Sequence, residues 1–255
     1  MIALLEHPVP SALIMAGGEG RRMARTHRTP KPLVAVLGVP LLEINLRKCL
    51  RAGFRPVTIA LGHAADAIIA HVRSCGDLPG AEVQFAVEPR PLGTAGALGL
   101  LAPPSETRLL TNGDLLSGID LGSMLAFHRH AHADLTIAVH FESHRLQLGE
   151  VVTADDLRVR DYLEKPTKQY RISSGTYLLE PVVHDLVAAG TRVDVPDLVR
   201  AAVHRRLNVL VYAHGQEWID VNDAVSLARA EEMLRRDPEC FGVTRASLQP
   251  QGSSP

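Results

Sequence analysis

The stretch Ala12-Leu-Ile-Met-Ala-Gly-Gly-Glu-Gly-Arg-Arg-Met23 joins a short apolar run to a loop rich in glycine and arginine. The apolar run predicts a buried β-strand at 12–15. Glycines let backbone N–H groups approach phosphate oxygens, because no Cβ stands in the way. In open α/β sheets, ligands bind at the carboxyl ends of the strands. The stretch therefore predicts an anion-binding loop at one edge of a parallel sheet.

Several interpretations of this loop compete. A dinucleotide fingerprint requires Gly-x-Gly-x-x-Gly, but Gly18-x-Gly20 is followed by Arg-Arg-Met, and residues 61–63 lack the acidic ribose ligand. A P-loop requires Gly-Lys-Ser/Thr, which is missing here. A third interpretation adds Arg22 and Lys31, two cations that would neutralise the charge of a nucleoside triphosphate. The alternative is a glycine-rich turn whose Arg and Lys side chains face solvent.

Composition restricts the class of protein. The chain has 255 residues, 46% hydrophobic and 22% charged, which fits a globular protein of one or two domains. Lys and Arg number 27 against 28 Asp and Glu, so the formal net charge is −1. This balance argues against a protein that coats nucleic acid or anionic membranes. We therefore expect a small-molecule ligand held by a few local charges, and no nucleic-acid or membrane partner.

The sequence also favours a cytoplasmic location. No apolar run approaches the ~20 residues needed to span a bilayer, and residues 1–10 lack the basic start and long apolar run of a signal peptide. Cys49, Cys75 and Cys240 are odd in number and far apart, which suits a reducing compartment and matches no zinc spacing. We expect all three to be small packed or surface residues.

Short apolar runs alternate with amphipathic stretches, which predicts an α/β fold with a mixed, mostly parallel sheet. The expected strands are 12–15, 57–61, 83–87, 108–111, 135–141, 149–153, 159–164, 175–179 and 208–213. The expected helices are 41–52, 64–73, 94–101, 121–131, 182–189, 195–204 and 222–235. The strands between 135 and 179 have short connections and are more antiparallel in character. Residues 242–255 are rich in Ser, Gln and Pro and predict a flexible tail.

Two aspartates are candidate metal ligands. Asp114 ends the strand at 108–111 within Thr-Asn-Gly-Asp, and Asp220 lies in Glu217-Trp-Ile-Asp before the last helix. A lone Asp after a strand is often only a cap or turn residue. At the carboxyl edge of a sheet beside a phosphate-binding loop, however, two carboxylates suit Mg²⁺, which also takes phosphate oxygens. Asn222, after the second motif, is suited to a positive φ and could cap the helix that follows.

Small residues follow the third strand, in the segment Glu88-Pro-Arg-Pro-Leu-Gly-Thr-Ala-Gly-Ala-Leu98. They leave room for a flat ring against the backbone. The segment is also compatible with a strand-to-helix turn in which Thr94 is the N-cap, and both roles can hold together.

His128, His130 and His132 suggest a metal site, but only His128 and His132 share a helix face and no third ligand lies nearby in the sequence. We therefore expect a polar helix face. No Ser-His-Asp or Cys-His order indicates a nucleophile.

Taken together, these motifs resemble the sugar-1-phosphate nucleotidyltransferases, or NDP-sugar pyrophosphorylases. The family pattern Ala-Gly-Gly-x-Gly-x-Arg-Met/Leu, followed by Pro-Lys-Pro, matches residues 16–23 and 30–32. The family segment Leu-Gly-Thr-Ala-Gly-Ala matches residues 92–97 without a gap. Asn-Gly-Asp and Trp-x-Asp match the two aspartate motifs, and the resemblance covers roughly residues 11–235.

Two departures affect the sugar side. The family pattern Val-Asn-Ala-Gly-Ile-Tyr-x-Leu-x-Pro matches residues 172–181, but the Asn that usually contacts the sugar falls on Ser173. A hydroxyl has a shorter reach and a different donor pattern from an amide. Relatives also carry an aromatic-Gly-Val segment where this chain has Leu146–Glu150. Glu164-Lys165-Pro166 matches the family's Glu-Lys-Pro, although by itself it is compatible with a surface turn.

The resemblance implies a role for each matched residue. Metal ligation falls on Asp114 and Asp220, and the catalytic cations are Arg22, Lys31 and Lys165, the last facing the sugar phosphate. The implied nucleotide-binding residues are Ala16, Gly17, Gly18, Gly20, Glu88, Leu92, Gly93, Thr94, Ala95, Asn112 and Gly113. The implied sugar-binding residues are Gly149, Glu164, Ser173 and Ser174.

The resemblance implies a three-layer, Rossmann-like fold with a small antiparallel sugar-binding portion, in one catalytic domain over residues 1–241. The implied reaction joins an NTP and a sugar 1-phosphate to give an NDP-sugar and pyrophosphate, with Mg²⁺. The resemblance is nearest to guanylyltransferases for mannose-type, heptose or aminosugar 1-phosphates, so GTP is preferred. Transfer of uridylyl or thymidylyl to another sugar or cyclitol phosphate, a non-catalytic nucleotide-sugar-binding regulator, and a glycosyltransferase remain alternatives. A homodimer is kept open beside a monomer.

Overall fold

Seven strands form one mixed sheet in the computed structural model, which describes residues 9–18, 30–75, 83–245 and 248. The strands are β1 (Ser11–Met15), β4 (Val57–Leu61), β5 (Val83–Val87), β6 (Arg108–Asn112), β8 (Leu135–Arg145), β11 (Thr167–Leu179) and β12 (Val209–Ala213). Their spatial order is β12-β8-β11-β6-β1-β4-β5. β11 runs antiparallel to both of its neighbours, and the other pairs are parallel. The mixed, mostly parallel sheet predicted from the sequence is confirmed.

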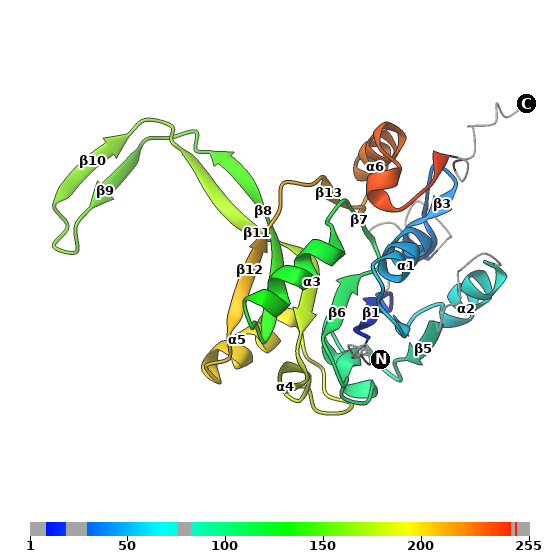
Figure 1. The fold of residues 1–255 in the computed structure, drawn as a ribbon. Helices are drawn as coiled ribbons and strands as arrows, with labels where there is room; N and C mark the ends of the chain where they lie inside the picture. Colours follow the sequence, from blue (N-terminus) through cyan, green and yellow to red (C-terminus); the bar gives the residue numbers. More distant parts are fainter. Residues whose placement is uncertain (1–8, 19–29, 76–82, 246–247, 249–255) are drawn as a thin grey trace, which may run out of the picture.

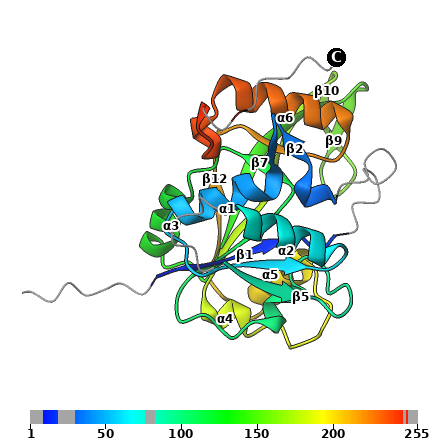
Figure 2. The same cartoon turned by 90° about the vertical axis from the view of Figure 1, so that its right-hand side faces the viewer.

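Helices cover both faces of this sheet, which gives the predicted three layers (Figures 1 and 2). On one face lie α1 (Leu41–Arg51), α2 (Ala65–Ser74) and α3 (Leu121–His130). On the other face lie α4 (Pro181–His184) and α5 (Val195–His204).

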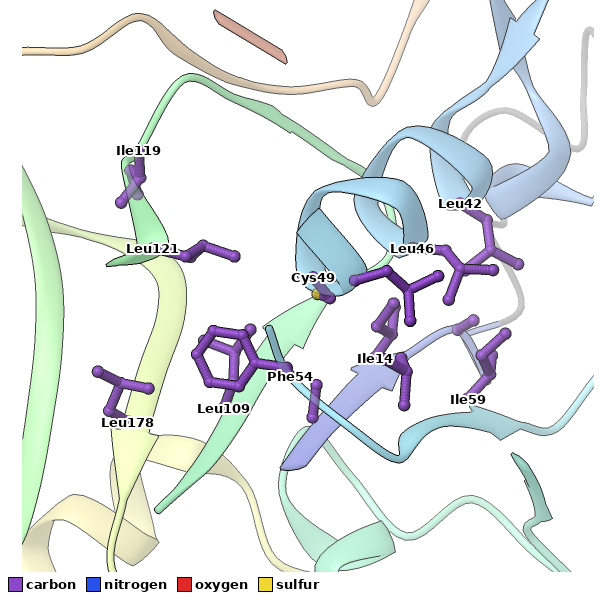
Figure 3. Close-up of a cluster of buried hydrophobic side chains, with 14 of the residues drawn as sticks. Ile14, Leu42, Leu46, Cys49, Phe54, Ile59, Leu109, Ile119, Leu121 and Leu178 are labelled. Atoms are coloured by element: carbon purple, nitrogen blue, oxygen red, sulfur yellow. The ribbon is translucent and has the colours of Figure 1, made fainter. Parts of the chain in front are cut away.

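Alternating side chains of the central strands supply two separate cores. Ile14 and Ile59 point into the cluster under α1, α2 and α3, where Phe54 and Leu109 also lie (Figure 3). Their neighbours Leu13 and Ala60 point into the opposite cluster, under α4 and α5. Each fully buried Ile or Leu contributes about 1.5–3 kcal/mol, so this alternation fixes the register of the sheet.

A third cluster holds smaller elements beside the sheet. Short antiparallel pairs join β2 (Ala35–Val36) to β3 (Val39–Pro40) and β7 (Leu115–Ser117) to β13 (Trp218–Asp220). The helix α6 (Ala224–Arg236) and the 3₁₀ helix η3 (Glu239–Phe241) complete this region. Val243, at the start of the segment expected to be a flexible tail, is buried in the same cluster.

An arm extends from the body of the molecule (Figure 1). It consists of the distal halves of β8 and β11, and it ends in a hairpin of β9 (Glu150–Thr153) and β10 (Val159–Leu163). Every residue of β10 is exposed. The antiparallel middle region predicted from the sequence is confirmed, although β8 and β11 are both longer than expected.

Three local predictions are wrong. The helix expected at 94–101 is only the 3₁₀ helix η2 (Gly96–Leu100), whose N-cap is Ala95 and not Thr94. The helix expected at 182–189 is only the single turn α4, which ends at His184. His128 does not contribute to a polar helix face, since it is buried and bonds Thr136 Oγ1 at 2.7 Å and Glu180 Oε1 at 3.0 Å.

Within the part of the chain that the structure describes, no helix is long and apolar enough to cross a membrane.

Candidate active site

A cavity of about 330 Å³ opens at the carboxyl ends of β1 and β6. Its volume lies within the range of small-ligand pockets. Four segments line it: the end of β1 with the glycines after it, the end of β6, the loop 88–94, and the loop 192–194. The lining residues are Met15, Gly17, Gly18, Glu88, Pro91, Gly93, Thr94, Asn112, Asp114, Arg192 and Asp194.

The two loops are joined by bonds between Thr94 and Asp194. Thr94 N donates to Asp194 Oδ1 at 2.9 Å, and Thr94 Oγ1 accepts from Val195 N at 2.9 Å, at the start of α5. Gly93 lies at this contact with φ of 83°, and a Cβ there would be 2.6 Å from Val193 O. The sequence predicted that Thr94 caps the helix after it, but the Thr94 hydroxyl accepts from the start of α5 instead.

Glu88 lies against the glycine loop. Its Oε2 accepts from Leu92 N at 3.0 Å, and its Oε1 is 3.2 Å from where a Cβ on Gly17 would stand. Burial raises the pKa of the Glu88 carboxyl, and the bond from Leu92 opposes this shift only in part. A carboxyl group held here can accept hydrogen bonds from the donor edge of a ring in the cavity.

Lys31 brings the two predicted metal ligands together. Its Nζ lies 2.5 Å from Asp114 Oδ2 and 3.3 Å from Asp220 Oδ1, and it donates to Asn222 Oδ1 at 2.6 Å. Lys31 is 12% exposed, whereas the two aspartates are 29% and 39% exposed. The pairing of β7 with β13 produces this meeting, because Asp220 is directly opposite Leu115, the residue after Asp114.

The donor set around Lys31 Nζ fits Mg²⁺. Magnesium takes one or two carboxylates together with waters and phosphate oxygens, and here Asp114 and Asp220 both lie within reach of one cation. The cation between them in this structure is the Lys31 ammonium. A metal ion would replace this ammonium between the carboxylates and leave Lys31 free to reach a phosphate.

Asn222 differs from its predicted role. Asn222 is not among the residues with a positive φ. The N-cap of α6 is Asp223, which forms a capping box with Ser226. The Asn222 side chain instead bonds Lys31. The prediction of a glycine-like or capping Asn222 is therefore wrong.

Ser174 belongs to a buried polar network. Its hydroxyl bonds His140 Nδ1 at 2.9 Å and His214 Nε2 at 2.8 Å, and Trp218 Nε1 donates to its carbonyl at 2.8 Å. The ring of Trp218 stacks on His140 with centroids 4.5 Å apart. Ser173 is exposed and bonds Tyr177 Oη at 2.8 Å. The network thus connects the base of the arm to β13, the strand that carries Asp220.

The structure does not bring Glu164 and Lys165 to the cavity. Both are exposed, in the turn between β10 and β11, and Lys165 has φ of 46°. Gly175, on the same strand β11, lies against Asn112. From Gly175 to Thr167 the strand advances about eight residues, on the order of 25 Å. Gly149 lies near the same turn, where a Cβ in its place would meet the side chain of Tyr162.

Some predicted nucleotide-binding residues support the cavity without lining it. Ala16, Leu92 and Ala95 are buried beneath it, and Gly113 N donates to Met15 O at 2.8 Å. Arg22 and Gly20 lie outside the described residues. Sequence reasoning missed Arg192 as a lining residue and did not assign Asp194 to the site. These two come from a loop about 100 residues after Thr94, and the connection becomes visible only in the fold, where Thr94 N donates to Asp194 and Ala95 N donates to Val193 O.

Ligand cavities at the carboxyl ends of parallel strands, beside a glycine loop and paired carboxylates, are typical of nucleotide-binding α/β proteins. Residues 11–237 match the family model described as Nucleotidyl transferase. The chain belongs to this family.

Individual relatives agree with this assignment. The chain is 30% identical over 234 residues to a mannose-1-phosphate guanylyltransferase of Mycobacterium tuberculosis, covering 88% of this chain and 64% of the relative. It is 28% identical over 231 residues to a UTP--glucose-1-phosphate uridylyltransferase of Synechocystis, covering 82% of this chain and 59% of the relative. The chain therefore spans about three fifths of these relatives.

A solved structure shares the fold. HddC from Yersinia pseudotuberculosis, in complex with GMP-PN, superposes with a TM-score of 0.63 at 22% identity, covering 88% of this chain and 98% of that one.

Proposed function

We propose that this protein is a sugar-1-phosphate nucleotidyltransferase, which joins an NTP and a sugar 1-phosphate to give an NDP-sugar and pyrophosphate. The observation that carries the proposal is the meeting of Asp114 and Asp220 around one cation position at the rim of the glycine-lined cavity. The named activities of the relatives, guanylyl and uridylyl transfer to sugar 1-phosphates, support the same reaction class.

In this reaction, an oxygen of the sugar phosphate attacks the α-phosphorus in line and pyrophosphate leaves. The attacking oxygen is already anionic at neutral pH, so the site needs no general base. Catalysis of this kind depends on positioning and on neutralising charge. Mg²⁺, held by Asp114 and Asp220, would supply charge neutralisation at the phosphates.

Lys31 has a particular part in this scheme. Its ammonium holds the two carboxylates together in the structure described here, and its side chain is nearly buried. With Mg²⁺ held by Asp114 and Asp220, the Lys31 ammonium would be free to stabilise the triphosphate and the leaving pyrophosphate. Arg22 has the same role in the proposal, on the strength of the family motif alone.

GTP is the preferred nucleotide, with support from the guanylyltransferase relative. UTP is the main alternative, because the uridylyltransferase relative matches almost as much of the chain. For the acceptor, Glu164, Ser173 and Lys165 are the proposed contacts, as the sequence motifs imply. Lys165 lies just before Thr167, the start of β11, and Thr167 is on the order of 25 Å along the strand from Gly175, which lies against Asn112. We therefore propose that the arm bends toward the nucleotide when the sugar phosphate binds.

Further parts of the proposal concern the setting of the enzyme. We propose one catalytic domain over residues 1–241, a cytoplasmic location, Mg²⁺ as cofactor, and small-molecule partners only. These rest on composition and on family resemblance. A non-catalytic nucleotide-sugar-binding regulator is the alternative, and the retention of Asp114, Asp220 and Lys31 in one cluster argues against it.

The deciding experiment measures pyrophosphate release over a panel of NTPs and sugar 1-phosphates with Mg²⁺. We expect release with at least one pair, and Asp114→Asn and Asp220→Asn should each lower kcat on the order of 100- to 1,000-fold. Glu232→Gln is the matched control, because Glu232 is an exposed carboxylate of α6. If no pair releases pyrophosphate while the nucleotide still binds, the regulator hypothesis is preferred.

A further inference from the structure

A second cluster of ligand-type side chains lies away from the active site, between α1 and α2. Glu43 comes from the first turn of α1, His71 from the last turn of α2, and Cys75 is the C-cap residue of α2. Their ligand atoms, Glu43 Oε2, His71 Nε2 and Cys75 Sγ, all lie within 4.8 Å of one another. None of the three lines the active-site cavity.

The dimensions of this triangle are those of a zinc site. In tetrahedral zinc, Zn–S near ~2.3 Å and Zn–N and Zn–O near ~2.0–2.1 Å place neighbouring ligand atoms about 3.3–3.6 Å apart. Here Sγ is 3.5 Å from Oε2 and 3.7 Å from Nε2, and Nε2 is 3.4 Å from Oε2. One ion can therefore contact all three atoms with shifts of only a few tenths of an ångström.

Local geometry keeps the three ligands in place. His71 and Cys75 are four residues apart, so they share one face of α2. Arg47 donates from Nε and Nη2 to Glu43 Oε1 at 3.0 and 2.9 Å, which leaves Oε2 directed to the cluster. Such an outer partner is typical of carboxylates that bind metals.

The chemistry of the ligands selects the type of metal. A thiolate and an imidazole favour Zn²⁺ over Mg²⁺ or Ca²⁺, which prefer oxygen alone. Glu43 and His71 side chains are 15% and 29% exposed, so an ion can enter from solvent and a water can fill the fourth position. We propose that Glu43, His71 and Cys75 form a zinc-type metal site that links α1 to α2.

On binding, the Cys75 thiol releases its proton to solvent and the thiolate sulfur donates to the metal, while His71 binds through neutral Nε2. The ion then fixes α2 to α1. Asn45 in α1 donates to Leu115 O at 2.8 Å, next to Asp114, so the linked helix is also the one that supports the active-site strand. The expected role is structural, because the site stabilises the packing of two helices.

The test is a Co²⁺ titration of the purified full-length protein after treatment with a chelator. We expect a thiolate-to-cobalt charge-transfer band that saturates at one thiolate-bound Co²⁺ per chain, and Zn²⁺ should displace this Co²⁺. Cys75→Ser should abolish the band and His71→Gln should weaken binding by at least about 100-fold, since even outer partners are worth 10- to 100-fold. Cys240→Ser and His130→Gln are matched controls that should retain it, because both residues lie on other elements.

Cobalt bound at Asp114 and Asp220 has no sulfur ligand, so it gives no thiolate band. The band should therefore persist in Asp114→Asn, and this test is independent of the proposed enzyme activity. Should Cys75→Ser fail to fold, alkylation of the wild-type protein gives a second readout. Zn²⁺ should slow modification of Cys75 at least tenfold and leave Cys240 unchanged. A folded wild-type protein with no thiolate band, a band that survives Cys75→Ser, or equal alkylation of Cys75 with and without Zn²⁺ would each overturn the proposal.

Discussion

We call the part of the sheet that carries the cavity, with β1, β4 and β6, the nucleotide side, after the proposed function. The nucleotide side and the arm are built in opposite ways. On the nucleotide side, β1, β4 and β6 are almost wholly buried, and four of the predicted site residues line one cavity at the ends of β1 and β6: Gly17, Gly18, Asn112 and Asp114. In the arm, every residue of β10 and most of the distal half of β11 are exposed. The predicted sugar-binding residues divide accordingly, since Ser174 is buried at the base of the arm and Glu164 is exposed in the turn between β10 and β11.

Under the proposed function, this difference would separate a preformed nucleotide site from an acceptor site that needs movement. The pairing of β7 with β13 and the Lys31 ammonium hold Asp114 and Asp220 around one cation position. The arm has no comparable core, because its two faces are both open to solvent. Binding sites that close on a second substrate commonly use such weakly packed segments. Matched changes on the nucleotide side and in the arm test this comparison.

The largest effect is expected from removing the hairpin. Glu150 and Leu163 are paired across β9 and β10, so a two-glycine linker in place of residues 150–163 can close the gap. The sheet should fold and bind NTP with unchanged affinity, while turnover with the sugar 1-phosphate should fall at least about 100-fold through lost positioning. Calorimetry with NTP and a pyrophosphate assay measure the two quantities.

Leu157→Gly is the control for this deletion, because Leu157 is an exposed residue of the hairpin with φ of 65°. It should leave both quantities as in the wild type. Full turnover in the deleted variant would show that the arm has no part in acceptor binding.

The sequence predicted the nucleotide side well for a physical reason. There each motif directly follows a buried strand, and parallel strands bring their carboxyl ends to one edge, so Gly17, Asn112 and Asp114 had to lie close together. Burial makes these strands continuous apolar runs, which are the strongest signal in a sequence.

The rest depended on contacts between distant segments. The distal parts of β8 and β11 are solvent-exposed and gave no apolar alternation, so both strands were predicted too short. Nothing local to Asn222 indicates that Lys31 will be its partner. Likewise, Glu43 is 28 or more residues from His71 and Cys75, so no short sequence motif predicts that they are neighbours. The fold brings the ligand atoms of these three residues within 4.8 Å of one another.

Two glycines provide a second contrast. A Cβ at Gly93 would meet the backbone oxygen of Val193 at 2.6 Å, at a φ of 83° that L-residues avoid. Gly93→Ala should therefore lower the free energy of unfolding by about 2–3 kcal/mol and raise the KM for NTP, because the loop has to shift. At Gly149, the group in the way is the exposed side chain of Tyr162, which can rotate aside.

Chemical denaturation of Gly93→Ala and Gly149→Ala, side by side, tests this contrast. Gly149→Ala should change stability by less than about 0.5 kcal/mol. Equal losses in the two variants would mean that the arm is packed as rigidly as the nucleotide side.

Adjacent serines at the base of the arm give a smaller contrast. Ser174→Ala leaves ring nitrogens of His140 and His214 without their buried partner, at a cost of about 1–2 kcal/mol. Ser173→Ala removes one part-buried bond to Tyr177 and should cost less, because Ser173 itself is exposed. Thermal unfolding measures both. Ser173→Asn, run over the sugar 1-phosphate panel, should change the preferred acceptor if Ser173 faces the sugar, and an unchanged preference would exclude it from acceptor selection.

The smallest effect concerns two lysines and pH. Burial lowers the pKa of Lys48 to about 8, and its Nζ donates to the carbonyl oxygen of Ser117, the last residue of β7. A bond to Glu150 instead raises the pKa of Lys168 on the exposed arm.

Below pH 8, Lys48 is charged in both states and its burial reduces stability. Between pH 8 and the ordinary value near 10.5, the unfolded chain binds more protons than the folded one, so the free energy of unfolding has to rise with pH. We expect this rise to be about 1 kcal/mol, since partial contact with water reduces the full effect. Urea titrations between pH 8 and 10.5 should show this rise in the free energy of unfolding for the wild type and not for Lys48→Met. Lys168→Met should show the same rise as the wild type. A wild-type curve parallel to that of Lys48→Met would mean that Lys48 keeps its ordinary pKa, and that the nucleotide side hides no buried charge beside its core.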